Sequence, residues 1–198
     1  DTPDGRLPNT NFRNNGQGVW LGYNFDRHKI GLSLDRYKLS TQTWFDDPEG
    51  QFDDFSVKIP KLEREKIGLF YDYAADGDYL KNIHVDAYSQ TIERKFENRV
   101  KTTQVIPSPM IKALTVSNQT NTNDKQYTQG VTLQSNFSLP ANNELVIGTQ
   151  YQHDKIKQDT DGSTRQTAAT GFFDTQTRTL SYNEAEQSNT SLFAQNDW

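Results

Sequence analysis

The chain has 198 residues, of which 32% are hydrophobic and 12% aromatic, and its mean hydropathy is −0.90. A soluble domain of this size usually carries nearer half apolar residues, whereas a disordered chain is poor in aromatic residues, so strands that bury only one face explain the composition better. The net charge of −5 argues against a nucleic-acid surface, and the absence of cysteine excludes disulfides and thiolate metal sites.

The first half of the chain predicts four strands. Along residues 11–25, Val19, Leu21 and Tyr23 alternate with glycine, tryptophan and polar residues, which is the period-two signature of a strand. The same alternation recurs over 29–40, 61–74 and 79–95. We expect the apolar residues of each strand to face lipid and the others to face water.

The second half predicts three more strands, over 126–139 and 144–156 and from about Gln187 to the last residue. In the first of these, Val131 and Leu133 are expected to point outward. Inward residues such as Gln134, Gln150 and Gln152 are polar, which suits a wide, wet lumen. The facing of the last strand is ambiguous from the sequence. No apolar run approaches the roughly 20 residues that a transmembrane helix needs.

The connections between these strands alternate in length. The short ones are 26–28, 75–78 and 140–143, and the long ones are 41–60, 96–125 and 157–187. Outer-membrane β-barrels have short periplasmic turns and long extracellular loops. The sequence therefore predicts an all-β fold, an antiparallel up-and-down transmembrane β-barrel segment of about seven strands. Seven strands alone leave two open edges, which lipid does not tolerate, so we expect part of a larger barrel.

Aromatic residues gather beside the short turns on the predicted apolar face: Tyr23, Phe25, Tyr71, Tyr73 and Phe137. This pattern is typical of an aromatic girdle at the membrane interface. The alternative is that aromatic residues are simply common in strands. Because the chain has no signal peptide and Asp1 is not an initiator, we expect an internal piece of a longer chain.

Several stretches resemble barrel strands of TonB-dependent outer-membrane receptors, in particular haem/haemoglobin and iron-siderophore receptors: Arg6-Leu7-Pro8-Asn9-Thr10, Leu21-Gly22-Tyr23-Asn24-Phe25, His28-Lys29-Ile30-Gly31-Leu32-Ser33-Leu34-Asp35 and Ser191-Leu192-Phe193-Ala194-Gln195-Asn196-Asp197-Trp198. The resemblance implies a 22-stranded barrel in the cell outer membrane of a Gram-negative bacterium, with residues 1–198 as a partial barrel domain without its plug. It also implies import of haem, haemoglobin-derived haem or a ferric siderophore. The implied partners are the TonB system, the protein's own plug domain, this ligand and outer-membrane lipid, with no nucleic acid.

Two groups of residues are candidate ligand contacts. Trp44, Phe45, Phe52 and Phe55 surround an acidic loop and are expected to form part of a ligand-facing rim. Arg94, Lys95, Arg99 and Lys101 form a basic cluster that suits an anionic siderophore or lipopolysaccharide phosphates, with Arg94 and Arg99 as the main candidates. The alternative for both groups is an ordinary solvated loop.

Histidine is a common metal ligand. His153, expected at the outer end of its strand just before a long loop, is a candidate ligand contact, and His84 is expected on the inward face beside Asp86. The alternative for each is a solvated lumen or rim histidine, and His28, at a short turn, is expected to be structural.

No phosphate loop, nucleophile elbow or zinc-protease motif occurs, so we expect neither an enzyme nor a bound metal or resident cofactor. The alternatives left open are a passive porin-like or adhesin-like barrel and a soluble all-β ligand-binding module, with a barrel enzyme more distant.

Overall fold

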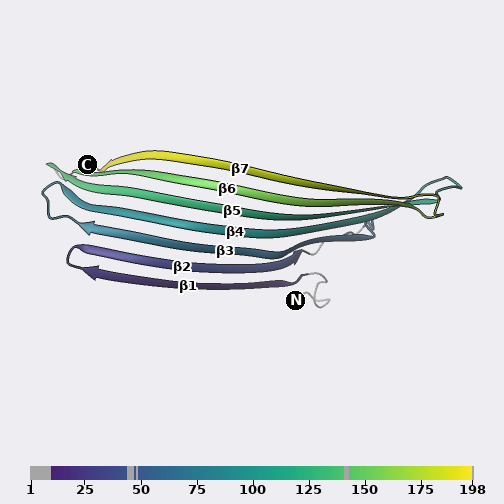
Figure 1. Cartoon of the computed structure of the whole chain (residues 1–198), viewed down its shortest axis with the longest axis horizontal. Helices are drawn as coiled ribbons and strands as arrows, with labels where there is room; N and C mark the ends of the chain where they lie inside the picture. The colour runs from purple at the N-terminus through teal and green to yellow at the C-terminus, as the bar shows by residue number, and fades with distance from the viewer. Residues whose placement is uncertain (1–9, 44–46, 48, 141–142, 198) are drawn as a thin grey trace.

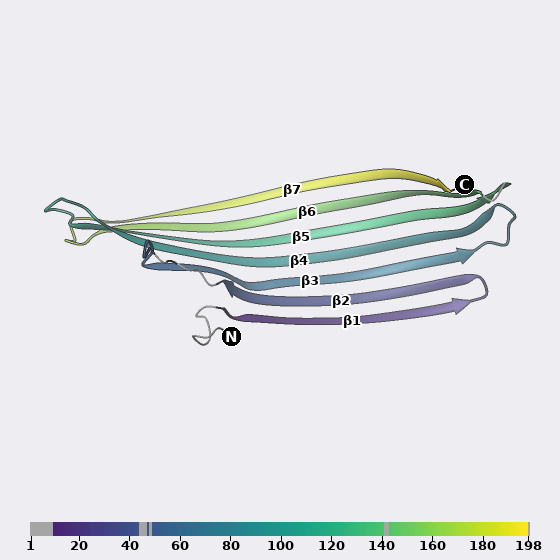
Figure 2. The same ribbon diagram turned by 180° about the vertical axis from the view of Figure 1, so that it is seen from behind.

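The computed structural model describes residues 10–43, 47, 49–140 and 143–197. These residues form a single antiparallel sheet in which each strand pairs with the next one along the chain (Figure 1). The seven strands are β1 (Phe12–Phe25), β2 (His28–Thr43), β3 (Asp54–Ala74), β4 (Leu80–Val105), β5 (Ala113–Leu139), β6 (Asn143–Ala168) and β7 (Asp174–Asp197). Viewed from behind, the strands run side by side over almost their whole length (Figure 2). The all-β, up-and-down arrangement predicted from the sequence is confirmed.

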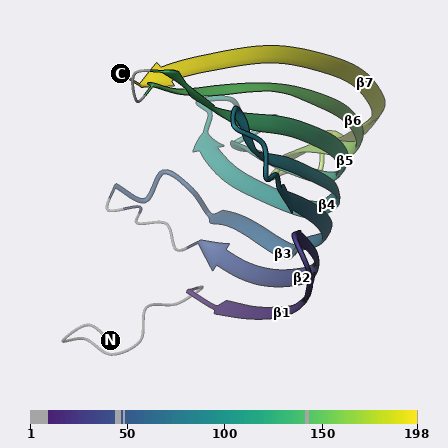
Figure 3. The ribbon, with the colours of Figure 1, turned by 90° about the vertical axis from the view of Figure 1, so that its left-hand side faces the viewer.

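The sheet is curved rather than flat. Seen end-on, the strands follow an arc whose two edges are β1 and β7 (Figure 3). At the end where β1 meets β2, the short turns lie together, and Arg27 in one turn pairs with Asp76 in the next. No helix among the described residues is long and apolar enough to span a membrane.

The strands are longer than predicted, and the long loops are correspondingly shorter. The connection expected over 96–125 shrinks to 106–112, because β4 and β5 stay paired from Leu80↔Phe137 to Val105↔Ala113. Likewise β6 and β7 are joined by 169–173 alone, and β2 and β3 by 44–53. The expected loop boundaries were therefore wrong, since polar strand extensions continue the backbone ladder well past the apolar segments.

The two faces of the sheet differ as the alternation predicted. Residues paired across strands share a face, and one such row consists of Leu21, Leu32, Leu69, Ala87, Val131, Tyr151 and Thr190. In β5, Val131 and Leu133 on this face are exposed, whereas Thr128 and Gly130 on the other face are buried. The apolar residues thus occupy the more exposed, outer face, as on the convex side of a curved sheet.

The apolar outer face has no protein partner within the described chain. Leu69 is 53% exposed, and Ala168 is the sole buried hydrophobic residue among the described residues. A soluble sandwich covers its apolar face with a second sheet, but the described strands form one layer. This exposed apolar band fits a surface that lipid covers.

Aromatic rings cluster on the outer face beside the short turns. The ring of His28 stacks on Phe25 at 4.8 Å and lies 5.0 Å from Tyr73, and its Nδ1 lies 2.8 Å from the hydroxyl oxygen of Tyr71. Tyr23 stacks on Phe25 at 5.7 Å. The expected aromatic gathering is therefore present here, with His28 as its centre.

Candidate functional site

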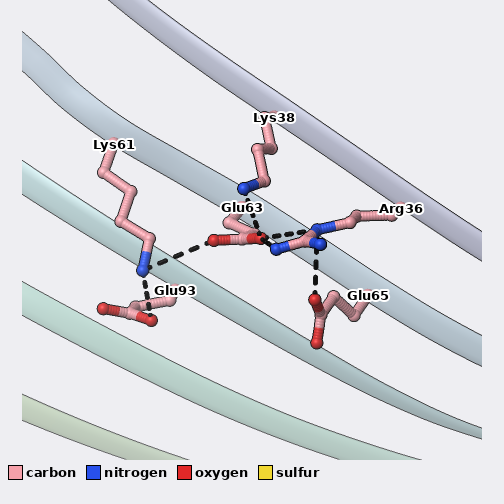
Figure 4. Close-up of polar contacts among 6 residues, drawn as sticks. All are labelled: Arg36, Lys38, Lys61, Glu63, Glu65 and Glu93. Carbon is pink, nitrogen blue, oxygen red and sulfur yellow. Dashed lines mark hydrogen bonds and ion pairs between the residues drawn. The ribbon is translucent and has the colours of Figure 1, made fainter. Parts of the chain in front are cut away.

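The outer face changes from apolar to charged where β2 and β3 leave the apolar band. Glu63 receives hydrogen bonds from Arg36 Nε at 2.8 Å and Arg36 NH2 at 2.5 Å, and Lys38 Nζ lies 3.3 Å away. Arg36 also reaches Glu65 at 3.2 Å. Lys61 lies 3.4 Å from Glu63 and continues the chain of ion pairs to Glu93 at 2.7 Å, so that three cationic side chains surround Glu63 (Figure 4).

This cluster fixes the protonation of its central carboxylate. The hydrogen bond from Arg36 lowers the pKa of Glu63 to about 2, with Lys38 adding to the effect. Glu63 lies beyond the apolar band, four residues along β3 from Ile67. The carboxylate therefore stays charged down to strongly acidic pH.

A second charged cluster lies on the same face at the other edge of the sheet. Lys155 in β6 pairs with Glu184 at 2.6 Å and with Glu186, both in β7. The hydrogen bond from Lys155 lowers the pKa of Glu184 to about 2. Networks of ion pairs contribute more to stability than isolated surface pairs. The two clusters together are called the charged belt, which consists of Arg36, Lys38, Lys61, Glu63, Glu65, Glu93, Lys155, Glu184 and Glu186.

The inner wall of the sheet carries aromatic rings that lie flat over glycine. A Cβ added to Gly31 would lie 2.0 Å from the Phe70 ring, and one added to Gly130 would lie 2.4 Å from the Tyr88 ring. Gly148 would meet the ring of Phe193 in the same way. Each glycine thus provides the space in which a ring from a neighbouring strand lies against the wall.

The rings on the inner wall are continuous with charged groups. Phe70 stacks on Trp20 at 6.1 Å and on His84 at 6.5 Å, and the ammonium of Lys29 lies 5.3 Å from its centroid. Lys66 lies similarly over the Tyr88 ring at 4.8 Å. The inner wall therefore offers both ring faces and charges to whatever occupies the lumen.

His84 lies on the inner face, as expected. Its Nδ1 is 2.5 Å from Asp72, while its Nε2 is 3.8 Å from Asp86, the neighbour considered in the sequence. The carboxylate of Asp72 on Nδ1 orients the ring and leaves Nε2 on the side of Asp86.

The placement expected for His153 was wrong. It lies in the middle of β6, because this strand continues to Ala168. It pairs with Gln129 and Ser188 on the outer face, and its Nδ1 lies 2.9 Å from the Ser188 hydroxyl. This position is remote from the loop ends and from the inner wall.

Local hydrogen bonds order the described part of the connection between β2 and β3. The carboxylate of Asp47 accepts hydrogen bonds from the backbone N–H groups of Gln51 at 2.9 Å and Phe52 at 2.7 Å. The rings of Phe52 and Phe55 then meet at 5.5 Å. The predicted rim residues Phe52 and Phe55 are thus brought together, while Trp44 and Phe45 lie outside the described residues.

The predicted basic cluster is divided between the two faces of β4. Arg94 points to the inner face, where its Nε donates to Asp124 at 2.8 Å, and Asp124 also accepts from Gln158 at 2.8 Å. Lys95 and Arg99 lie on the opposite face, because they differ from Arg94 by an odd number of residues. The expectation of one cluster was therefore wrong, since it rested on a loop where the chain forms a strand.

The sequence reasoning missed the fit of rings over glycine. The partners lie on different strands, such as Gly31 beside Phe70 and Gly130 beside Tyr88. Only the strand register identifies such pairs. Among the described residues, no group of three or more histidines and carboxylates is arranged to hold a metal ion.

Comparison with known proteins identifies the fold. No family model and no curated protein matches the sequence. Among solved structures, the ferric yersiniabactin uptake receptor FyuA from Yersinia pestis matches over 91% of this chain and 25% of its own chain, with a TM-score of 0.50 and 14% identity. The chain has the fold of a β-barrel segment. The resemblance to TonB-dependent receptors is thereby confirmed at the level of fold.

The chain spans a quarter of the length of that receptor. Two Pseudomonas aeruginosa structures, OccK10 (OpdN) and OccK2 (OpdF) in complex with glucuronate, are 7% and 9% identical to this chain. They cover 94% and 95% of it and 96% and 94% of their own chains, with TM-scores of 0.14 and 0.13. At these TM-scores they carry no argument about this chain.

Proposed function

We propose that this chain is a partial barrel domain, without its plug, of an outer-membrane receptor that imports an iron source with energy from the TonB system. The observation that carries the proposal is the match of 91% of the chain to a quarter of a structure described as an uptake receptor. The apolar outer face, which has no protein partner within the described chain, supports the membrane location.

The transported iron source is haem, haemoglobin-derived haem or a ferric siderophore. The inner wall suits such a large ligand, because Trp20, Phe70 and Tyr88 present ring faces and Lys29 and Lys66 present charge. A passive pore needs only a water-filled passage and no aromatic faces on its wall. The presence of these rings therefore favours recognition of a ligand.

The ligand-contacting residues within this segment are Phe52, Phe55 and Arg94. The two phenylalanines lie together at the end of the sheet away from the short turns, and Arg94 lies on the inner wall below them. Arg99 and His153 point to the outer face, so we leave them out of the binding surface.

The test is growth of an iron-starved strain that expresses the full-length protein, with haem, haemoglobin or one ferric siderophore as the sole iron source, with and without TonB. We expect growth on one source that requires TonB. Growth that is indifferent to TonB, together with leakage of small solutes through the membrane, would contradict the proposal and favour a passive barrel.

A matched pair of variants separates the binding surface from the scaffold. Arg94→Gln on the inner wall and Arg36→Gln on the outer face each remove an arginine that is hydrogen-bonded to a carboxylate. At equal amounts of folded protein in the membrane, we expect Arg94→Gln to raise the ligand concentration for half-maximal growth and Arg36→Gln to leave it unchanged. Equal behaviour of the two variants would remove Arg94 from the proposed surface.

A further inference from the structure

A hollow lies on the outer face of β4–β7, beyond the charged belt. Its volume is about 540 Å³, within the range of small-molecule sites. Two adjacent cross-strand rows provide its outward side chains: Lys95, Asn123, Asp159 and Tyr182, then Glu97, Asn121, Asp161 and Leu180. Four strands therefore contribute two side chains each to one surface.

Most of the outward polar side chains of this hollow have no partners, unlike the ion-paired side chains beside it. Around it, Lys61 pairs with Glu93 and Lys155 with Glu184. Two of its own residues are also paired: Arg178 donates two hydrogen bonds to Asp161, and the Tyr182 hydroxyl donates to Glu184. Inside it, the side chains of five residues make no hydrogen bond or ion pair with any residue that the structure describes: Lys95, Glu97, Asn121, Asn123 and Asp159. These five side chains lie together in one hollow and are therefore available to an external partner.

One of these groups is also removed from water. The Oδ1 of Asn123 is buried and accepts no hydrogen bond from the described residues. A buried polar atom without a partner costs free energy, and such atoms are rare in native structures. A ligand hydroxyl that donates to this oxygen, once the amide has turned it toward the hollow, would remove that cost.

Apolar contact area lies next to the polar groups. Leu180 is 67% exposed and Tyr182 is 56% exposed, and both belong to the hollow. A surface that combines an aromatic ring, an aliphatic side chain, amides, carboxylates and one ammonium group matches a molecule with hydroxyl groups around an apolar C–H face. A sugar ring has this chemistry. A metal ion is not favoured, because no three histidine or carboxylate side chains of the described residues are grouped so that they could hold one.

We propose that this hollow binds a sugar residue of the oligosaccharide carried by the outer-leaflet glycolipid. The hydroxyls of the sugar would donate to Asp159, Glu97 and Asn123 and accept from Lys95, while its C–H face lies on Tyr182 and Leu180. The assignment of the glycolipid as the source rests on the proposed function, which places the barrel in the outer membrane.

The height of the hollow supports this source. On β6, Asp159 lies eight residues beyond Tyr151, the last exposed apolar residue of the band on this strand. At roughly 3.3 Å per residue and a tilt of about 40°, this places the hollow roughly 20 Å above the edge of the apolar band. Saccharide, rather than acyl chains or the phosphates next to them, occupies that height.

The experiment uses the full-length protein in detergent and titrates it with delipidated core oligosaccharide up to about 10 mM, a range that reaches weak, millimolar affinities. Binding is followed by saturation-transfer NMR and calorimetry. We expect the oligosaccharide to bind the unaltered protein, and Asp159→Asn and Asn123→Ala each to weaken binding roughly tenfold, the loss expected for one good hydrogen bond. Asp159→Asn keeps the shape of the side chain, so folding is preserved in at least this variant.

Two controls on the same face lie outside the hollow: Glu65→Gln, in the charged belt, and Asn15→Ala, in β1. We expect both to bind like the unaltered protein. The proposal would be overturned if the oligosaccharide does not bind, if pocket and control variants bind equally well, or if only the intact glycolipid binds. None of these readouts involves iron uptake, so TonB-independent growth alone would reject the proposed function and leave the sugar site standing.

Discussion

At the scale of single residues, glycines determine where aromatic rings can lie on the inner wall. The ring of Phe70 occupies the space that a Cβ at Gly31 would need, and the nearest approach would be 2.0 Å. Gly16, by contrast, is 3.8 Å from the nearest atom that its Cβ would meet, an ordinary contact. Two glycines of one sheet thus have different importance, which composition alone does not reveal.

Gly31→Ala is expected to destabilise the folded barrel by about 1–3 kcal/mol, because the Phe70 ring must leave its position. Gly16→Ala is the control and is expected to change stability little. The measurement is the free energy of unfolding in denaturant of the full-length protein in vesicles. In the double variant with Phe70→Ala, the methyl group has space, so the two effects should not add; strict additivity would contradict the proposed contact.

Glu63 provides a prediction about pH. Its folded pKa of about 2 lies below the ordinary 4.5, so the stabilisation is fully present above pH 4.5 and is lost as pH falls toward 2. We expect the difference in melting temperature between the unaltered protein and Glu63→Gln to be constant above pH 5 and to shrink steadily below pH 4.5. A difference that does not change between pH 6 and pH 3 would show that Arg36 does not hold this carboxylate.

At the scale of strands, the alternation of faces decides which substitutions are tolerated. Leu69 lies in the middle of the apolar band, and Thr132 lies on the inner wall, paired with Asp86. A charge on the outer face must enter lipid, whereas a charge on the inner wall meets water or other polar groups.

Leu69→Lys is therefore expected to destabilise the barrel by about 2–4 kcal/mol, as found for cations near the bilayer midplane. Thr132→Lys, placed opposite Asp86, should cost far less. Unfolding titrations in lipid vesicles compare the two variants with the unaltered protein. Equal losses would mean that the assignment of faces is reversed or that lipid does not cover this surface.

The connections between strands test the orientation of the sheet. The turn at 106–112 joins β4 to β5, and the turn at 75–79 lies at the opposite end of β4. A peptide tag inserted after Ser108 should be labelled by antibody on intact cells, and a tag after Gly77 only after permeabilisation. The reverse labelling pattern would invert the proposed orientation.

Strands could be predicted from the sequence only where lipid imposes a pattern. In β6, Leu145, Ile147 and Tyr151 gave the period-two signal, whereas 157–167 contains no apolar residue at all. That polar half is held by ladder hydrogen bonds and by cross-strand pairs such as Arg178 with Asp161, neither of which leaves a periodic signature. The expected loop boundaries failed for this reason, and with them the placements of His153, Arg94 and Arg99.

At the scale of the whole molecule, the described sheet is an open arc. β1 and β7 each pair on one side only, and almost every residue of both strands is exposed. Within lipid such edges would leave backbone groups unpaired, which fits the proposal that further strands of the same protein close the barrel. The match to a quarter of a receptor chain fits the same picture.

The order of the strands has a consequence for how such proteins diversify. Each strand makes its substantial contacts only with the strand before it and the strand after it, so the sheet behaves as a string of hairpins. A duplicated or deleted hairpin would change the circumference of the wall without altering any other interface. In a family of such proteins, the barrel can gain, lose or exchange hairpins while the remaining hairpins keep their neighbours. The sequence of each strand is then constrained only by the two strands beside it.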